Sequence, residues 1–174
     1  MQTTIKQFKK LQPSKFTAFT LNRISFVIIG FGILVRLVQY LFNRSLWNDE
    51  AALALNIINR SYLELLQPLD YNQGAPLGFL MVEKLAVQLF GNNEYALRLF
   101  PLVSSIASLF LFYHLAKRCL QKPAIPIALT LFVGLEYLLY FASEVKQYST
   151  DVAVAILGAT IGVSLNRKKI EPFQ

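Results

Sequence analysis

The chain has 174 residues, of which 55% are hydrophobic and only 16% are charged, and its formal net charge is +7. An ordinary soluble domain of this length has a smaller apolar share and more charge, so a self-contained soluble fold is not expected. A nucleic-acid-binding surface is not expected either, because the basic residues gather between apolar blocks, as they do in the cytoplasmic loops of membrane proteins.

The N-terminal segment 1–23 carries a basic cluster that we expect in the cytoplasm. The apolar run 24–42 is long enough to span a bilayer and too long for a signal peptide, so we interpret it as a retained anchor. Arg36 lies near its end. An ionisable residue in a span is a functional candidate, although this side chain could also reach out to the lipid headgroups. The basic cluster of the N-terminal segment 1–23 consists of Lys6, Lys9, Lys10, Lys15 and Arg23.

Residues 43–98 form a long outer connection that is too rich in Leu, Ala and Phe to be disordered. The pattern predicts a helix over 48–59, which Asn48 could cap and whose first turn holds two acids. A second helix is predicted over 76–90 and is closed by Gly91. Charged residues in the middle of this second helix favour a position along the membrane interface.

Three more spanning helices are predicted, over 99–116, 124–141 and 147–165. The span 124–141 contains Glu136, which is a functional candidate because a charge inside a span is energetically expensive. An even number of crossings places both termini on one side. The basic tail 166–174 and the basic connection after the second span then lie in the cytoplasm with the N-terminus.

The prediction is therefore an all-α, polytopic membrane protein. About four transmembrane helices lie within residues 24–165, with one or two interfacial helices in the first outer loop, 43–98.

Two adjacent carboxylates, Asp49 and Glu50, follow the first predicted span at the outer membrane surface. Near a low-dielectric medium a carboxylate can hold a raised pKa and serve as a base or a metal ligand. The alternative interpretation is a pair of acids in the first turn of a helix, which needs no chemistry.

Further polar residues lie on the same side. The turn 71–77 could bind a sugar or a phosphate through its amides, or it could be a plain turn. Glu94 and Arg98 lie four residues apart on one predicted helical face and could simply pair. In the loop 143–151, Lys146 could meet a phosphate and Asp151 could support the acid pair. The alternative there is a polar loop with a local ion pair.

Two residues carry no chemistry in this interpretation. His114 has no clustered Cys or His partners, so a zinc site there is not expected. Cys119 is the single cysteine, which excludes an intramolecular disulfide, and we interpret it as a reduced thiol.

Four motifs follow one another along the chain: LWNDEA at 46–51, APLGFL at 75–80, FGNNEYALRLFP at 90–101 and EVKQYSTD at 144–151. Their order resembles the N-terminal part of the GT-C superfamily of membrane glycosyltransferases. That superfamily includes the protein O-mannosyltransferases, the aminoarabinose transferases of lipid A and the bacterial RgtA/B/C/D-like enzymes. The resemblance covers about residues 20–165, and the last motif is most similar to the RgtA/B/C/D-like branch.

The resemblance implies transfer of a sugar from a polyprenyl-phosphate donor to a glycan, lipid or protein acceptor, at the outer face of a bacterial cell (inner) membrane. Asp49 would be the catalytic base that deprotonates the acceptor, and Glu50 would support it or bind a divalent cation. A cation such as Lys146 or Arg98 would stabilise the leaving phosphate. The candidate substrate-binding residues are Tyr71, Gln73, Arg98, Lys146, Tyr148 and Asp151.

The chain departs from the family in two ways. Gly74 and Ala75 stand where some branches carry a lysine, so phosphate binding could fall elsewhere. Family members also have more crossings, so this chain could be a fragment or a half that needs a missing C-terminal partner. Two other functions stay open. One is a non-catalytic membrane subunit or remnant of the same fold. The other is a small transporter with a relay through Arg36, Glu136 and Asp151.

Overall fold

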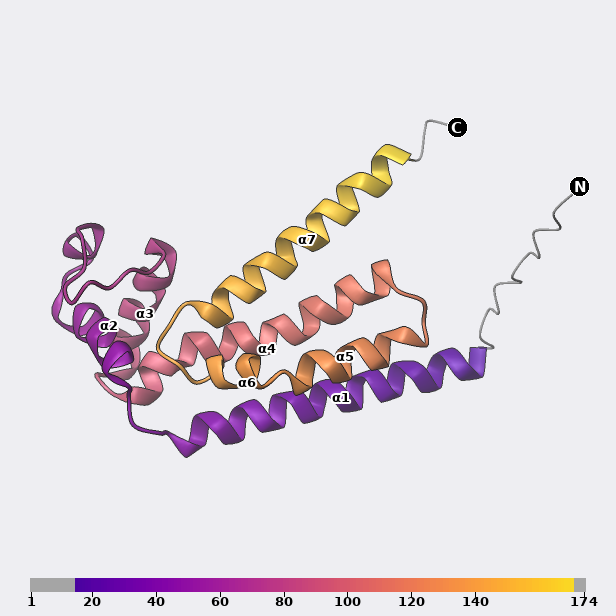
Figure 1. Cartoon of the computed structure of the whole chain (residues 1–174), viewed down its shortest axis with the longest axis horizontal. Coiled ribbons are helices and arrows are strands. Elements are labelled where there is room, and N and C mark those ends of the chain that lie inside the picture. Colours follow the sequence, from indigo (N-terminus) through magenta and orange to yellow (C-terminus); the bar gives the residue numbers. More distant parts are fainter. Residues whose placement is uncertain (1–14, 171–174) are drawn as a thin grey trace, which may run out of the picture.

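The computed structural model describes the backbone of residues 15–170 and the side chains of residues 19–165, and this part of the chain is all-helical (Figure 1). The predicted all-α class is therefore confirmed. Residues 1–14, which hold most of the predicted cytoplasmic basic cluster, and residues 171–174 of the predicted tail lie outside the described part.

In the described part, three helices are long and apolar enough to cross a membrane: α1 (Lys15–Phe42), α4 (Glu94–Cys119) and α7 (Tyr148–Ile170). Helices α1 and α4 contain the predicted spans 24–42 and 99–116, and α7 covers the predicted span 147–165 except for its first residue. Helix α4 begins before the predicted residue 99 because Asn93 caps it, with its side chain accepting a 2.9 Å hydrogen bond from the backbone N–H of Ala96.

The predicted span 124–141 is wrong as one continuous helix. Helix α5 (Ala124–Gly134) ends where Leu135 adopts an extended conformation with ψ 109°, and α6 (Glu136–Phe141) begins after it. The 11 residues of α5 extend only about 16 Å at 1.5 Å per residue, which is about half of a bilayer core. The break follows a poor helix former, Gly134, and brings Glu136 to the surface in the first turn of α6, where the helix dipole favours an acid.

The outer connection folds into α2 (Asn48–Asn59), a short 3-10 helix η1 (Glu64–Leu66) and α3 (Leu77–Phe90). Both predicted helices are confirmed, and Gly91 ends α3 in a left-handed conformation with φ +89°.

The predicted cap of α2 is wrong, because Asn48 is already the first helical residue and Trp47 occupies the cap position. The carboxylate of Glu50 accepts a 3.0 Å hydrogen bond from the Trp47 backbone N–H and so satisfies this helix end from inside the first turn.

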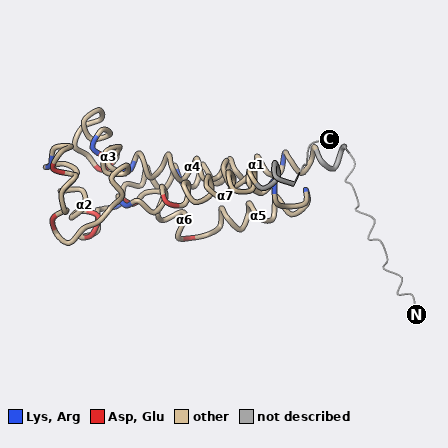
Figure 2. Tube along the Cα trace, turned by 90° about the horizontal axis from the view of Figure 1, so that it is seen from above, with Lys and Arg blue, Asp and Glu red and all other residues tan. Residues whose placement is uncertain are grey.

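The long helices lie side by side, and α2 and α3 form a separate layer across one end of the bundle (Figure 1). Helix α4 packs against α7 and α1, and α1 packs against α5. The connection between α4 and α5, and both ends of the described chain, lie at the opposite end. Figure 2 shows charged residues gathered mainly around α2 and α3, whereas the helical bundle is mostly uncharged.

Two buried apolar clusters hold these parts together. The outer cluster joins α2, η1 and α3 to the start of α4, and the bundle cluster joins α1, α4, α5 and α7. In contrast, the outward faces of α1 and α7 leave large apolar side chains exposed, among them Phe26, Val27, Phe31, Val154, Leu157 and Ile161. Such continuous apolar surface indicates a non-aqueous environment or a partner.

Candidate functional site

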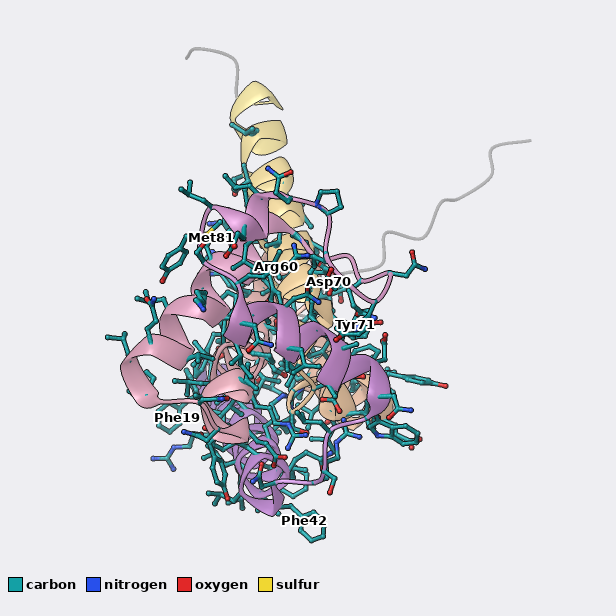
Figure 3. All side chains as sticks on the ribbon, turned by 90° about the vertical axis from the view of Figure 1, so that its left-hand side faces the viewer. Phe19, Phe42, Arg60, Asp70, Tyr71 and Met81 are labelled. Carbon is teal, nitrogen blue, oxygen red and sulfur yellow. The ribbon has the colours of Figure 1, made fainter. Side chains whose placement is uncertain are left out.

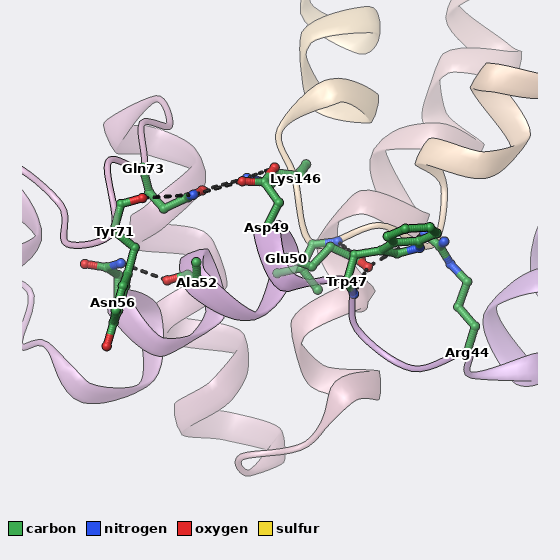
Figure 4. Close-up of polar contacts among 10 residues, drawn as sticks. Arg44, Trp47, Asp49, Glu50, Ala52, Asn56, Tyr71, Gln73 and Lys146 are labelled. Carbon is green, nitrogen blue, oxygen red and sulfur yellow. Dashed lines mark hydrogen bonds and ion pairs between the residues drawn. The ribbon is translucent and has the colours of Figure 1, made fainter.

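Three of the predicted site residues meet at the α2 end of the bundle (Figure 4). The Lys146 ammonium lies 2.8 Å from one oxygen of the Asp49 carboxylate. The side-chain amide of Gln73 donates a 2.8 Å hydrogen bond to the other oxygen and accepts a 2.7 Å hydrogen bond from Lys146. These residues come from α2, the turn before α3 and the loop before α7, so the fold unites three distant segments in one polar triad.

The charge state of Asp49 differs from the sequence-based expectation. Hydrogen bonds from Lys146 and then Gln73 lower the pKa of the Asp49 carboxyl below its ordinary value, whereas a raised pKa was expected. The expectation fails because Asp49 is 66% exposed and directly paired. The rise in pKa from desolvation is therefore smaller than the lowering by its hydrogen bonds. In this state Asp49 is an ionised carboxylate held by a lysine.

Glu50 points the opposite way and is fully buried. One carboxylate oxygen accepts a 2.8 Å hydrogen bond from the backbone N–H of Val145, and the other accepts the bond from Trp47 described above. The guanidinium groups of Arg44 and Arg98 each lie 3.8 Å from this carboxylate. Glu50 therefore ties the start of α2 to the loop before α7.

This environment does not support the predicted metal role of Glu50. Its oxygens face N–H donors and two cations, which would repel a divalent ion. In residues 19–165 no group of three or more acidic, histidine or cysteine side chains is placed to hold a metal ion.

Arg98 does not behave as predicted from its spacing to Glu94. Its ion pair is with Glu50, and it also donates a 3.0 Å hydrogen bond to the side-chain oxygen of Asn43 just after α1. Arg98 is fully buried, so a substrate reaches it only if this cluster opens.

Sequence reasoning missed Arg44 and Tyr140. The Arg44 guanidinium lies 3.9 Å from the centre of the Tyr140 ring and donates a 2.6 Å hydrogen bond to the Tyr140 hydroxyl. This contact anchors α6 next to Glu50. The signal that could have found Arg44 is its position just past the first apolar run, but nothing local links it to a residue 96 positions away.

Glu144 completes the charged surroundings. Partial burial, and next the negative charge of Glu50, raise the pKa of the Glu144 carboxyl above its ordinary value. One of its oxygens is buried and accepts no hydrogen bond from the described residues. Glu144 therefore holds its proton more strongly than an isolated glutamate would.

The other predicted binding residues lie at the edge of the triad. Tyr71 is exposed in a left-handed turn conformation with φ +59°, and its backbone carbonyl accepts a 3.4 Å hydrogen bond from Gln73. Figure 3 shows Tyr71 next to Asp70, whose carboxylate lies 3.0 Å from the Arg60 guanidinium. Tyr148 packs its ring against Phe141 at the start of α7.

The predicted relay residues are not joined. Arg36 is buried inside the bundle, and it does not reach the headgroups as the sequence allowed. Glu136 and Asp151 are exposed, and neither side chain makes a hydrogen bond or ion pair with the described residues, so Asp151 does not support the acid pair.

Comparison of the chain with protein-family models gives no match, and comparisons with curated proteins and with solved structures give none either. The resemblance to the GT-C superfamily therefore stays a prediction from the motifs.

Proposed function

We propose that this chain is a membrane glycosyltransferase, or the N-terminal part of one, that transfers a sugar from a polyprenyl-phosphate donor. The observation that carries the proposal is the meeting of Asp49, Gln73 and Lys146 just beyond one end of the apolar bundle. A carboxylate and a cation side by side are the two groups that this reaction needs, one for the acceptor proton and one for the leaving phosphate.

The ion pair between Asp49 and Lys146 supplies a way to couple donor binding to catalysis. A lipid phosphate that takes over the Lys146 ammonium removes the interaction that lowers the pKa of Asp49. The freed carboxylate then accepts the proton of an acceptor hydroxyl, whose oxygen forms a bond to the anomeric carbon. The bond from that carbon to the phosphate oxygen breaks. Polyprenyl phosphate leaves, and the Lys146 ammonium stabilises its negative charge.

Two hollows support substrate binding, one beside the triad and one along the bundle. A cavity of about 380 Å³ is lined by residues 65–69 and 73–75 together with Leu77 and Leu80, and Gln73 is a member of both the cavity wall and the triad. Its mixed apolar and amide lining suits a sugar ring.

A second, apolar groove of about 510 Å³ lies between α1 and the α5–α6 break. Leu139 lines this groove, and its neighbour Tyr140 contacts Arg44. Arg44 in turn lies beside the carboxylate of Glu50, the residue that follows Asp49. We assign the groove to the prenyl chain, because its lining is almost entirely apolar and it faces outward from the bundle. The lining residues are Val27, Ile28, Phe31, Val35, Thr130, Val133, Gly134 and Leu139.

The proposed setting is the bacterial cell membrane, with both termini in the cytoplasm and α2 and α3 at the outer surface. The exposed apolar faces of α1 and α7 support immersion in lipid. In this proposal α5 and α6 together make the fourth crossing as a broken helix, which returns the chain to the end of the bundle that holds the triad.

Sugar transfer from polyprenyl-phosphate sugars, measured with the full chain in membranes, tests the function. Asp49→Asn should abolish transfer while leaving the bundle folded. Asp70→Asn is the matched control, because Asp70 is equally exposed at 67% and is also paired with a cation, but lies outside the triad. Equal transfer by wild type and Asp49→Asn contradicts the base assignment.

One observation favours the non-catalytic alternative, a subunit or remnant of the same fold. The Asp49 carboxylate is already neutralised by Lys146, as a purely structural ion pair would be. Absence of transfer in wild type, with stability lost in Lys146→Met, would support that alternative.

A further inference from the structure

A second polar site lies inside the bundle, apart from the triad. Arg36 on α1 is 1% exposed, and its Nε donates a 2.7 Å hydrogen bond to the hydroxyl of Ser105 on α4. One terminal nitrogen donates a 3.1 Å hydrogen bond to the Gly32 carbonyl of its own helix. No carboxylate in residues 19–165 forms an ion pair with Arg36, so its charge is left without a counter-charge in the apolar bundle.

A small cavity adjoins this guanidinium. It measures about 10 Å³ and lies where α1, α4, α5, α6 and α7 meet. This is the volume open to the centre of a water-sized particle, so the cavity holds a single small, near-spherical particle. The polyatomic phosphate of a lipid donor does not fit. The lining residues are Arg36, Ser105, Ser108, Phe132, Leu138, Ser149 and Val152.

The hydroxyls around the cavity have unused donor capacity. Ser149 is 3% exposed, lines the cavity, and its Oγ has no hydrogen-bond partner among the described residues. Ser105 accepts from Arg36 through its oxygen, which leaves its own O–H free to donate. Ser149 also lies in the first turn of α7, where the helix dipole is positive. All these groups favour the same occupant, a small negative charge.

We propose that the cavity binds a single monatomic anion of the chloride class, held by the Arg36 guanidinium and by the hydroxyls of Ser105 and Ser149. A water molecule would satisfy the hydroxyls but leave the buried charge uncompensated, which is unfavourable in a low-dielectric interior. An anion at this position offsets that charge and holds the start of α7 against α1 and α4. The site is independent of the glycosyltransferase proposal.

The test uses the purified full chain in detergent at constant ionic strength, with sodium chloride compared with sodium gluconate. Gluconate is too large for the cavity, so chloride alone should raise the midpoint of thermal unfolding, by roughly 2–8 °C and with saturation at one site. Excess broadening of the ³⁵Cl NMR signal should accompany this shift and should be removed by competing bromide.

Two variants at the cavity and one outside it make the result specific. Ser149→Val should fold and lose both the chloride-dependent shift and the excess broadening, and Arg36→Gln should lose them as well. Ser143→Ala is the matched control, because Ser143 is another buried hydroxyl without a partner in the described part but does not line the cavity. Ser143→Ala should keep the full chloride response.

Other outcomes overturn the proposal. Equal unfolding midpoints in chloride and gluconate, without excess ³⁵Cl broadening in wild type, rule out an anion site. A Ser149→Val variant that loses the same stability in both salts indicates that the cavity holds only a water molecule. A chloride response that survives in both Ser149→Val and Arg36→Gln places the anion elsewhere.

Discussion

The carboxylate of Glu50 and the backbone N–H of Val145 are joined by a 2.8 Å hydrogen bond across 95 positions of sequence. Val145 precedes Lys146, and Glu50 follows Asp49, so this bond sets the register between the two residues of the ion pair. The buried acid is thus a positioning residue, and the exposed acid is the one available to a substrate.

Replacing Glu50 by glutamine tests this positioning role. We expect Glu50→Gln to lower the free energy of unfolding by about 3–5 kcal/mol, because Arg98 is then left buried without its counter-charge. Denaturant unfolding followed by circular dichroism measures the change. The double variant Glu50→Met with Arg98→Met should be more stable than Glu50→Gln, and Asp70→Asn should unfold like wild type. Wild-type stability in Glu50→Gln would show that the pair is not needed.

Lys146→Met tests the electrostatics of the triad. The pKa of Asp49 should rise toward its ordinary value, because the largest cause of its lowering is the hydrogen bond from Lys146. Gln73→Ala should produce a smaller rise, since Gln73 is the second cause. Carbon-detected NMR titration of the Asp49 carboxyl reports both. An Asp49 titration that is the same in Lys146→Met and wild type would contradict the observed pair.

The same pair makes a small pH-dependent contribution to stability. Because the folded pKa of Asp49 is lowered, the stabilisation is present above the ordinary carboxyl pKa and is lost as pH falls through the lowered value. Solvent screens the Asp49 carboxylate, which is 66% exposed, so the contribution is about 1 kcal/mol or less. Lys146→Met should remove this part of the dependence of stability on acid pH. The role of Lys146 in binding the donor phosphate is measured separately, by sugar transfer at neutral pH.

Local signals explain how much of the fold could be predicted. The helix over 48–59 was predictable because acidic residues in its first turn precede an apolar stretch. The end of α3 was predictable because Gly91 adopts a positive φ that ends the helix. The break at Leu135 was not, because one glycine and one glutamate within an apolar run also occur in continuous spans. It depends on how α5 and α6 pack against α1.

The site was predictable in its members and not in its arrangement. Asp49, Gln73 and Lys146 are polar residues next to apolar helices, which marked each of them separately. Their contacts, and the opposite burial of Asp49 and Glu50, arise from segments far apart in the chain. The pKa of Asp49 is lowered, whereas the base interpretation allowed a raised value, because its partner Lys146 was not visible locally.

Glu83 on α3 is a second residue whose titration is expected to make the stability depend on pH. This glutamate is fully buried, neither carboxyl oxygen has a hydrogen-bond partner in the described part, and burial raises its pKa well above the ordinary value. Between the ordinary and the raised pKa, the folded state keeps the proton that the unfolded state releases. Stability therefore falls as pH rises from the ordinary glutamate pKa toward the raised one.

Glu83→Gln should remove that fall. We expect the variant to be more stable than wild type at pH 8 and closer to it at pH 5, as measured by denaturant unfolding at both values. Gln88→Ala on the same helix loses only an exposed hydrogen bond with Tyr62, so its effect should be equal at the two pH values. A Glu83→Gln variant with the wild-type pH dependence would contradict the raised pKa of Glu83.

The native thiol of Cys119 offers a direct test of the proposed topology. Cys119 is exposed at the end of α4, and the outer connection lies at the other end of the bundle. In intact cells a membrane-impermeant maleimide should leave Cys119 unlabelled, and permeabilisation should expose it. In a Cys119→Ser background, Gln67→Cys should be labelled in both conditions, whereas Gln121→Cys, next to the native position, should behave as Cys119 does. Equal labelling of Gln67→Cys and Gln121→Cys in intact cells would place both ends of the bundle on one side, because an impermeant reagent cannot reach two membrane faces at once.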